Sequence, residues 1–188
     1  LVSGYYLIIL LSVIYLIDHN FNIIEVDFLK IIFFTLLLFY IFNILGFVYL
    51  GDSGSYLIAF IVGVFMIKLN EINYLISPYY IVSLLWYPAF ENLFSLIRRV
   101  YKNTNVSYAD KLHLHQLIFR YLKAKKIFNK KLINPMTALI ILVFNLPSFI
   151  ISSLLFSHTK SLIFILMINI IIYLLAYYFL SKNFKFKK

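Results

Sequence analysis

Residues 161–180 read SLIFILMINIIIYLLAYYFL and contain no Asp, Glu, Lys or Arg. A helix needs about 20 such residues to cross a typical bilayer. Of the 188 residues in the chain, 63% are hydrophobic and 13% are charged. Soluble domains average about 45–50% apolar and about 25% charged residues. The sequence therefore predicts an integral membrane protein, and the absence of cysteine excludes disulfides and thiolate metal sites.

Further apolar spans precede this one, and together they suggest six membrane crossings. The six spans are residues 1–17, 28–42, 56–69, 79–100, 136–156 and 161–180. Lipid excludes irregular chain and open sheet edges, so each span is expected to be a helix. We therefore expect an all-α polytopic integral membrane protein, a single membrane domain over residues 1–188 with about six transmembrane helices.

Prolines mark two helix starts and two bends. Two prolines follow an N-cap residue, in the pairs Ser77-Pro78 and Asn134-Pro135. Such a pair favours a helix that begins with Pro in its first turn. The other two prolines, Pro88 and Pro147, fall inside apolar spans and are expected to kink them.

The charge distribution predicts the orientation. The formal net charge is +10, and 14 of the 17 basic residues lie in residues 98–131 or 182–188. The positive-inside rule then places residues 100–134 and the C-terminus in the cytoplasm, and alternation adds residues 43–55 to the same face. The charge thus indicates membrane orientation and anionic headgroups rather than nucleic acid.

The longest polar segment, residues 101–135, is expected to be a basic, histidine-containing cytoplasmic loop. Apolar residues recur within it at helical spacing: Leu114, Leu117, Ile118, Tyr121 and Leu122. With Arg120, Lys123, Lys125 and Lys126 nearby, this pattern predicts an amphipathic helix that lies in the membrane interface.

Residues 50–55 read LGDSGS and separate two apolar spans. A carboxylate there is costly unless it is hydrated, paired or bound to a cation. Asp52 in a glycine-rich turn before a helix N-terminus suits a Mg²⁺ ligand beside phosphate. The serines are expected near the N-cap of the next helix. The alternative is a turn with a helix-capping Asp or Ser.

Residues 110–116 read DKLHLHQ. On a helix, His113 and His115 would point to nearly opposite sides, whereas in extended chain they share a face. Either the segment is not helical there, or the two histidines have different roles. Imidazoles can bind metal or phosphate; two interfacial histidines without a ligand are the alternative, and a zinc site is not expected.

Glu91 and Asn92 lie near the cytoplasmic half of the fourth span, one to two turns before Arg98 and Arg99. An ionisable residue at membrane depth is a functional candidate by default. The alternative is an interhelical hydrogen bond or an internal ion pair.

Together these stretches resemble the polyprenyl-phosphate N-acetylhexosamine-1-phosphate transferases of glycosyltransferase family 4. The family includes the undecaprenyl-phosphate GlcNAc-1-phosphate transferases and the phospho-N-acetylmuramoyl-pentapeptide transferases. The matching stretches are residues 50–55, residues 88–99 (PAFENLFSLIRR), residues 110–116 and Asn134-Pro135. The likeness extends in order and spacing over most of residues 1–147.

The resemblance implies a phosphoglycosyl transferase of the bacterial inner membrane, acting in the first membrane step of a cell-surface glycan pathway. It would move a sugar 1-phosphate from a UDP-N-acetylhexosamine to undecaprenyl phosphate and release UMP. The site would face the cytoplasm and need Mg²⁺, with Mn²⁺ as an alternative. Expected partners are these two substrates, the lipid bilayer and, as a candidate, a second copy of the chain; nucleic acid is not expected.

The resemblance also assigns roles by position. Asp52 matches an aspartate associated with the metal and the diphosphate, which makes it the candidate catalytic residue. The candidate substrate-binding residues are His113, His115, Arg98, Arg99, Gly51, Ser53 and Gly54. The chain departs from the family at Gln116, where a further His is common, and at Glu91, where many relatives have Asp.

The family's paired aspartates and its Asp-Gly segment have no match here. Residues 1–6 (LVSGYY) resemble the residues that follow that segment. We therefore expect the chain to be the C-terminal half of a larger enzyme and to be inactive alone. One alternative is a non-catalytic membrane remnant or a lipid- or partner-binding paralogue. Another, a small transporter, would need polar residues along the mid-membrane faces of several helices.

Overall fold

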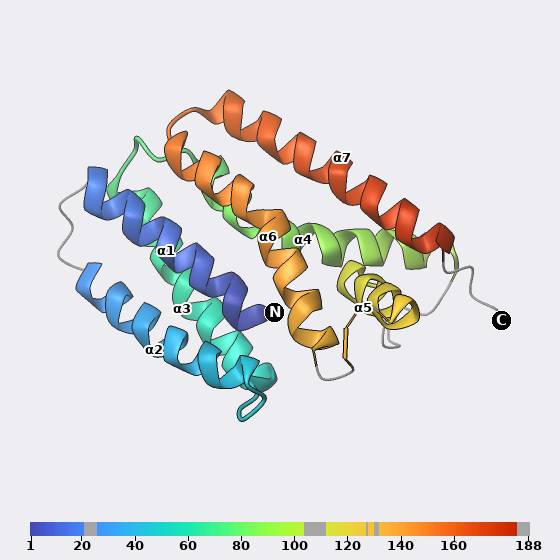
Figure 1. Ribbon diagram of the computed structural model, residues 1–188. Coiled ribbons are helices and arrows are strands. Elements are labelled where there is room, and N and C mark those ends of the chain that lie inside the picture. Colours follow the sequence, from blue (N-terminus) through green and yellow to red (C-terminus); the bar gives the residue numbers. More distant parts are fainter. Residues whose placement is uncertain (21–25, 104–111, 127, 130–131, 184–188) are drawn as a thin grey trace.

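The computed structural model describes residues 1–20, 26–103, 112–126, 128–129 and 132–183. These residues form α-helices and no strand (Figure 1). The helices are α1 (Val2–Asn20), α2 (Val26–Ile44), α3 (Gly51–Ile72), α4 (Pro78–Tyr101), α5 (Leu114–Lys125), α6 (Ile133–Leu154) and α7 (Thr159–Asn183).

The helices α2, α3, α4, α6 and α7 are long and apolar enough to cross a membrane, and α1 is a shorter apolar helix. The prediction of an all-α polytopic membrane protein is confirmed. The spans expected at residues 28–42 and 56–69 are longer in the structure, because flanking residues, many of them polar, also adopt helical geometry. Among the described residues, α5 lacks both the length and the apolar character of a membrane span, as the sequence predicts.

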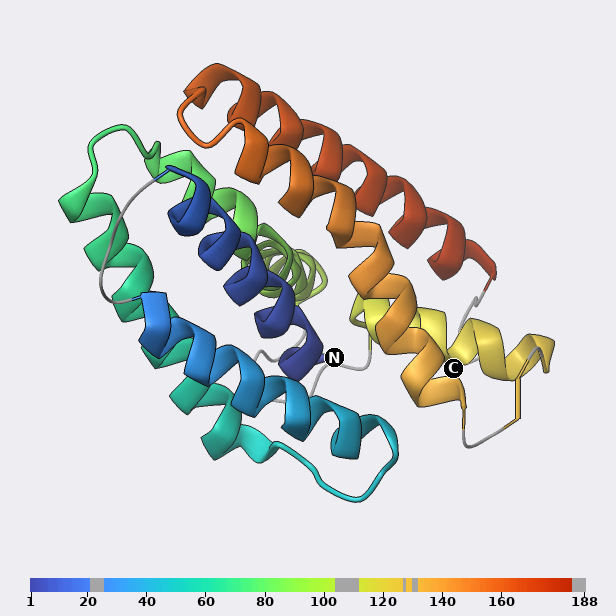
Figure 2. The same ribbon diagram turned by 60° about the vertical axis from the view of Figure 1, so that its left-hand side comes forward.

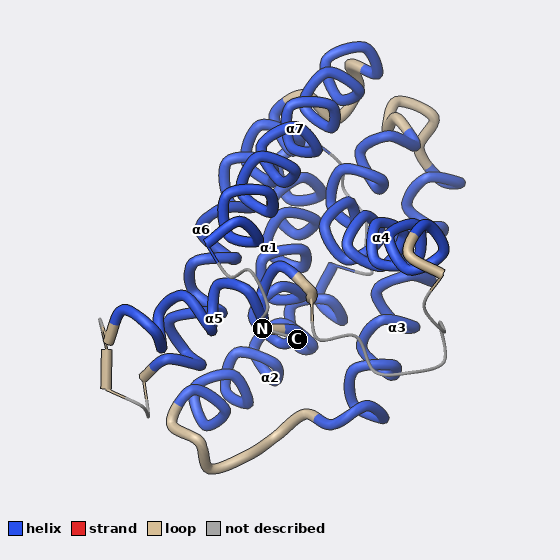
Figure 3. Tube along the Cα trace, turned by 90° about the vertical axis from the view of Figure 1, so that its right-hand side faces the viewer, coloured by secondary structure: helices blue, strands red, loops and turns tan. Residues whose placement is uncertain are grey.

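Successive long helices run up and down the bundle, so the connections alternate between its two ends (Figures 1 and 2). One end carries Leu1, the connection between α2 and α3, α5 and the start of α6; we call it the α5 end. Figure 3 looks onto this end. The structure therefore brings residues 50–55 and the two histidines to the same end of the molecule.

Helices α1 and α6 form the centre of the bundle. Helix α1 packs against α2, α3 and α6, and α6 also packs against α4, α5 and α7. Gly4 makes the close approach of α1 to two neighbours possible. A Cβ atom at Gly4 would lie 2.8 Å from Leu142 Cδ1 on α6 and 2.9 Å from Tyr40 Cε2 on α2.

One of the two predicted helix starts is confirmed. Ser77 is the N-cap of α4, with its hydroxyl accepting from Tyr79 N at 3.3 Å and Pro78 in the first turn. Ser77 also ties this connection to the one between α6 and α7, because its N–H donates to Phe156 O at 2.9 Å and its Oγ lies 2.8 Å from Thr159 Oγ1.

The prediction that Asn134 caps α6 is wrong. Helix α6 begins at Ile133, and its N-cap, Leu132, makes no side-chain capping bond. A turn bond from Leu132 N to Asn129 O, 2.8 Å long, precedes this early start. Pro135 is tolerated in the first turn because N–H groups there have no intrahelical acceptor.

Pro88 and Pro147 lie inside α4 and α6, and both helices change direction along their length (Figure 1). Proline has no N–H, so Pro88 leaves the carbonyl of Leu84 without its helical donor. The buried hydroxyl of Tyr5 on α1 donates to this oxygen at 2.9 Å. A neighbouring helix thus satisfies a backbone group that lipid could not.

The amphipathic helix that the sequence predicts is α5, and its apolar face packs against protein. Leu114, Leu117 and Leu122 are buried, and α5 packs against α6 and α7. Its apolar face is therefore covered by protein, while Lys123 and Lys125 are exposed. Asp110 and Lys111, which precede the histidines, lie outside the described residues, as do 104–109, 127, 130 and 131 of the predicted loop.

We expect the Tyr5→Phe variant to lose about 1 kcal/mol of unfolding free energy in detergent micelles, because the Leu84 carbonyl then lacks its donor. Replacing Pro88 by Ala supplies a helical N–H to the same oxygen, so the cost of Tyr5→Phe should shrink in a Pro88→Ala background. The same change at the exposed Tyr178 should have no effect. Equal costs in both backgrounds would contradict this account of the proline.

Candidate functional site

Asp52 lies in the first turn of α3, with its side chain exposed at the α5 end. It lines a cleft of about 510 Å³ between α1, α2, α3 and α6, together with Gly51, Asn43 and Asn134. Ser53 and Gly54 do not line this cleft. A carboxylate in the first helical turn is electrostatically favourable, because the N-terminus of a helix carries a partial positive charge.

Residues 50–55 form a helix start rather than the predicted separate turn with a serine cap. The N-cap position falls on Leu50, which makes no side-chain capping bond, and Gly51 has a φ of 65°. Ser55 instead donates its hydroxyl to Gly51 O at 2.7 Å, one helical turn back. The left-handed backbone at Gly51 explains why glycine occupies the position next to Asp52.

A second cleft, of about 610 Å³, lies between α5 and α6. Side chains from α5 give it cationic and hydrogen-bonding character, and the residues of α5 that line it are His115, Gln116, Phe119, Arg120 and Lys123. The two clefts share Leu1, Asn134 and Ala138 as lining residues, so they adjoin. One continuous surface thus offers a carboxylate at one side and cationic donors at the other.

The described ranges contain no group of three or more His, Asp or Glu side chains suited to hold a metal ion. Asp52 is the carboxylate that the two clefts offer. Mg²⁺ usually binds proteins through one or two carboxylates and completes its shell with water and substrate phosphates. The residues present therefore fit Mg²⁺ only as an ion held jointly by Asp52 and a bound phosphate group.

His113 is the N-cap residue of α5 and has extended geometry, with φ −66° and ψ 150°. His115 lies in the first turn of the helix. This agrees with the alternative in which the segment is not helical at the first histidine. The two rings stack, with centroids 5.5 Å apart and planes inclined by 13°. The orientation of His115 beside the cleft is thus linked to that of His113.

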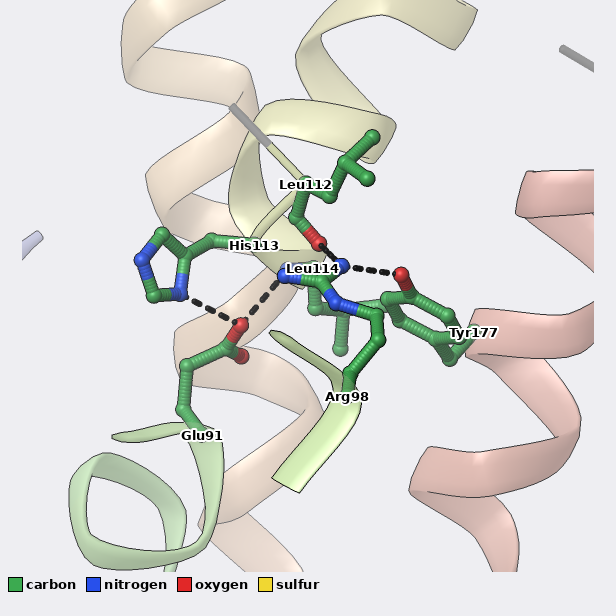
Figure 4. A network of polar contacts seen from close by, with 6 residues as sticks. All are labelled: Glu91, Arg98, Leu112, His113, Leu114 and Tyr177. Carbon is green, nitrogen blue, oxygen red and sulfur yellow. Dashed lines mark hydrogen bonds and ion pairs between the residues drawn. The ribbon is translucent and has the colours of Figure 1, made fainter. Parts of the chain in front are cut away.

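Glu91 on α4 holds the start of α5 (Figure 4). Its side chain is buried, and Oε1 accepts a hydrogen bond from Leu114 N at 2.8 Å. The same oxygen lies 3.0 Å from Nδ1 of His113. Of the two alternatives for Glu91, the structure contains the interhelical contact, and that contact engages one of the predicted site residues.

Arg98 lies two turns after Glu91 on α4 and contacts the backbone just before α5 (Figure 4). Its Nη1 donates to Leu112 O at 2.9 Å and to the hydroxyl of Tyr177 on α7. The guanidinium carbon lies 5.6 Å from the centroid of the Tyr177 ring. Arg98 and its half-buried neighbour Arg99 line neither cleft, so their expected role in substrate binding stays a prediction.

Three features of the site were not predicted from the sequence. These are the contact of Glu91 with the start of α5, the place of Asn134 in both clefts, and the alignment of Gln116, Arg120 and Lys123 along one cleft. The alignment of Gln116, Arg120 and Lys123 could have been found from the sequence, because positions 116, 120 and 123 recur at the spacing of a helical face. The other two depend on tertiary contacts.

The chain matches no protein-family model, no curated protein and no solved structure. The site is therefore described by its own geometry.

Replacing Gly51 by Ala should cost about 1 kcal/mol of unfolding free energy, because a Cβ atom is strained at a φ of 65°. Gly63 in the same helix has open space around its Cα, so Gly63→Ala should be neutral or stabilising by up to ~1 kcal/mol. Thermal unfolding of both variants in micelles measures the difference. Equal effects would argue against the left-handed backbone at Gly51.

Proposed function

We propose that this chain is part of a phosphoglycosyl transferase that moves N-acetylhexosamine-1-phosphate from a UDP-sugar to a polyprenyl phosphate such as undecaprenyl phosphate. The single observation that carries the proposal is the pair of adjoining clefts, with Asp52 in one and His115, Arg120 and Lys123 in the other. Such a surface suits a diphosphate, whose negative charge needs both a cation and basic donors. The resemblance of four sequence stretches to these transferases supports the same reading.

In the proposed reaction, an oxygen of the lipid phosphate attacks the phosphorus that carries the sugar. A new phosphorus–oxygen bond forms, the diphosphate bond of the UDP-sugar breaks, and UMP leaves with the bonding electrons. Phosphoryl transfer of this kind depends on positioning and charge stabilisation more than on a protein nucleophile. Arg120 and Lys123 would bind phosphate oxygens, and His115 would supply a further donor beside them.

Asp52 would hold Mg²⁺ together with the substrate phosphates, at the bilayer surface on the cytoplasmic side. When bound there, the ion would neutralise charge on the diphosphate. The exposed position of Asp52 next to Gly51 leaves room for that shared coordination. No other residue of the two clefts is assigned to the metal.

A second candidate function is a non-catalytic membrane protein that binds a lipid or a partner. The observation that favours it is the lack of a multi-carboxylate metal group within the described part of the chain. The reading frame upstream of Leu1 separates the two. Paired acidic residues in preceding apolar helices would support the transferase, and a start codon immediately before Leu1 would support the non-catalytic protein.

The Asp52→Asn variant of the longest open reading frame that contains this chain should lose Mg²⁺-dependent UMP release by at least about 100-fold, because the amide is a poor ligand for a hard cation. UMP release with a panel of UDP-sugars measures it. Glu71→Gln makes the same chemical change at the opposite end of α3 and should retain activity. Near-normal activity of Asp52→Asn would disprove the metal role.

Two lysines in the last turn of α5 allow a matched test of the second cleft. Both side chains are exposed, but Lys123 lines the cleft and Lys125 does not. Lys123→Ala should raise KM for the UDP-sugar about three- to tenfold through loss of a phosphate contact. Lys125→Ala should leave KM unchanged. Equal effects would indicate a general surface-charge effect instead of a contact in the cleft.

A further inference from the structure

Glu91 is a charged residue in a helix long and apolar enough to cross the membrane, and it is only 6% exposed. A buried carboxylate is costly unless hydrogen bonds or an opposite charge compensate it. Both contacts to Oε1 come from residues 113 and 114, across the segment that links α4 to α5. The compensation of this charge is therefore inseparable from the placement of the start of α5.

The start of α5 in turn needs an acceptor from outside the helix. The first N–H groups of a helix have no intrahelical partner, and the His113 side chain makes no capping bond to them. Glu91 Oε1 accepts from the first of them, Leu114 N–H, at 2.8 Å. A negative charge at this position is also favoured by the helix dipole. Glu91 thus supplies from another helix the capping acceptor that the N-cap residue, His113, does not provide.

The same oxygen determines how the His113 ring is held. An ionised carboxylate accepts hydrogen bonds and cannot donate them, so with Glu91 ionised the 3.0 Å contact requires a proton on Nδ1 of His113. Nε2 lies on the far side of the ring from Glu91 (Figure 4). Because the ring stacks on His115, its orientation passes to a residue that lines the second cleft.

Arg98 supports the segment from the opposite side. It donates to Leu112 O, one residue before His113, and is itself held by Tyr177 on α7. The backbone from Leu112 to Leu114 therefore lies between an acidic and a basic side chain of the same helix, seven residues apart. Arg98 and Glu91, two turns apart on α4, thus hold Leu112 and His113, the residues that lead into α5.

Two tyrosines complete the surroundings of Glu91. The hydroxyls of Tyr87 and Tyr173 interact with its carboxylate, although within the described residues neither they nor Oε2 makes a hydrogen bond of ordinary geometry. The two contacts of ordinary geometry are therefore those that Oε1 makes with residues 113 and 114.

We propose that Glu91 is a positioning residue: through His113 and its stack on His115, it orients the imidazole that borders the cleft for the UDP-sugar. This rests on the proposed transferase function for its kinetic consequence. The physical part, that Glu91 fixes residues 112–117, stands on the contacts alone. Replacement of Glu91 by Leu removes both contacts and keeps an apolar side chain of similar size, whereas Glu91→Gln keeps an oxygen acceptor.

The first measurement is hydrogen–deuterium exchange on the protein encoded by the longest open reading frame that contains this chain, reconstituted in lipid nanodiscs. In the Glu91→Leu variant, amides of residues 112–117 should exchange at least tenfold faster, while α6 should be unchanged. The Glu91→Gln variant should stay within threefold of the wild type, because its carbonyl still accepts from Leu114 N–H. The neighbouring exposed residue provides the control Asn92→Ala, which should match the wild type. Unchanged exchange in Glu91→Leu overturns the proposal.

The second measurement is UMP release by the same proteins. In Glu91→Leu, kcat/KM for the UDP-sugar should fall at least tenfold because KM rises, while KM for the polyprenyl phosphate should change less than twofold. Glu91→Gln should retain most of the wild-type kcat/KM. Faster exchange without any change in KM overturns the positioning role. If the wild-type protein releases no UMP, the proposed function fails, and exchange alone then decides whether Glu91 fixes this segment.

Discussion

Polar groups inside this bundle must find partners within the protein, because lipid offers none. The structure meets this constraint with contacts between helices that are distant in the chain. Tyr5 on α1 satisfies the Leu84 carbonyl on α4, and Asn169 on α7 donates to Ser148 Oγ on α6 at 2.7 Å. Glu91 follows the same rule, and its partners belong to the start of α5. The need to compensate buried polarity therefore links the membrane helices to the residues that border the clefts.

Much of the architecture follows from local sequence. Apolar spans of sufficient length predict helices in lipid, and all six expected spans have a helix in the structure. Ser77 followed by proline predicts the start of α4, because capping involves only neighbouring residues. The placement of Asp52 and the histidines at one end follows from the number of helices between them, which alternate in direction. These features depend on composition, on hydrophobic periodicity and on whether an even or odd number of helices lies between two segments. A single sequence contains all three.

What the sequence did not reveal concerns the exact starts of two helices and the contacts between elements that are distant in the chain. Helix α3 begins at Gly51, and α6 begins before Asn134, in both cases without the expected side-chain cap. Glu91 was recognisable as a charge at membrane depth, yet its acceptor role depends on a residue 23 positions later. The burial of the apolar face of α5 likewise depends on α6 and α7, since an amphipathic pattern fits a protein surface as well as a membrane surface.

The proline in α4 also has a consequence for the order of assembly. When α4 enters the membrane, its Leu84 carbonyl lacks an intrahelical donor, and in lipid that vacancy favours association with a helix that offers one. Helix α1 precedes α4 in the chain and carries Tyr5, so the donor is already present when the acceptor arrives. A local break in one helix thereby becomes a point of attachment for another: α4 packs mainly against α6 and α7, and the Tyr5 hydroxyl adds a bond to α1.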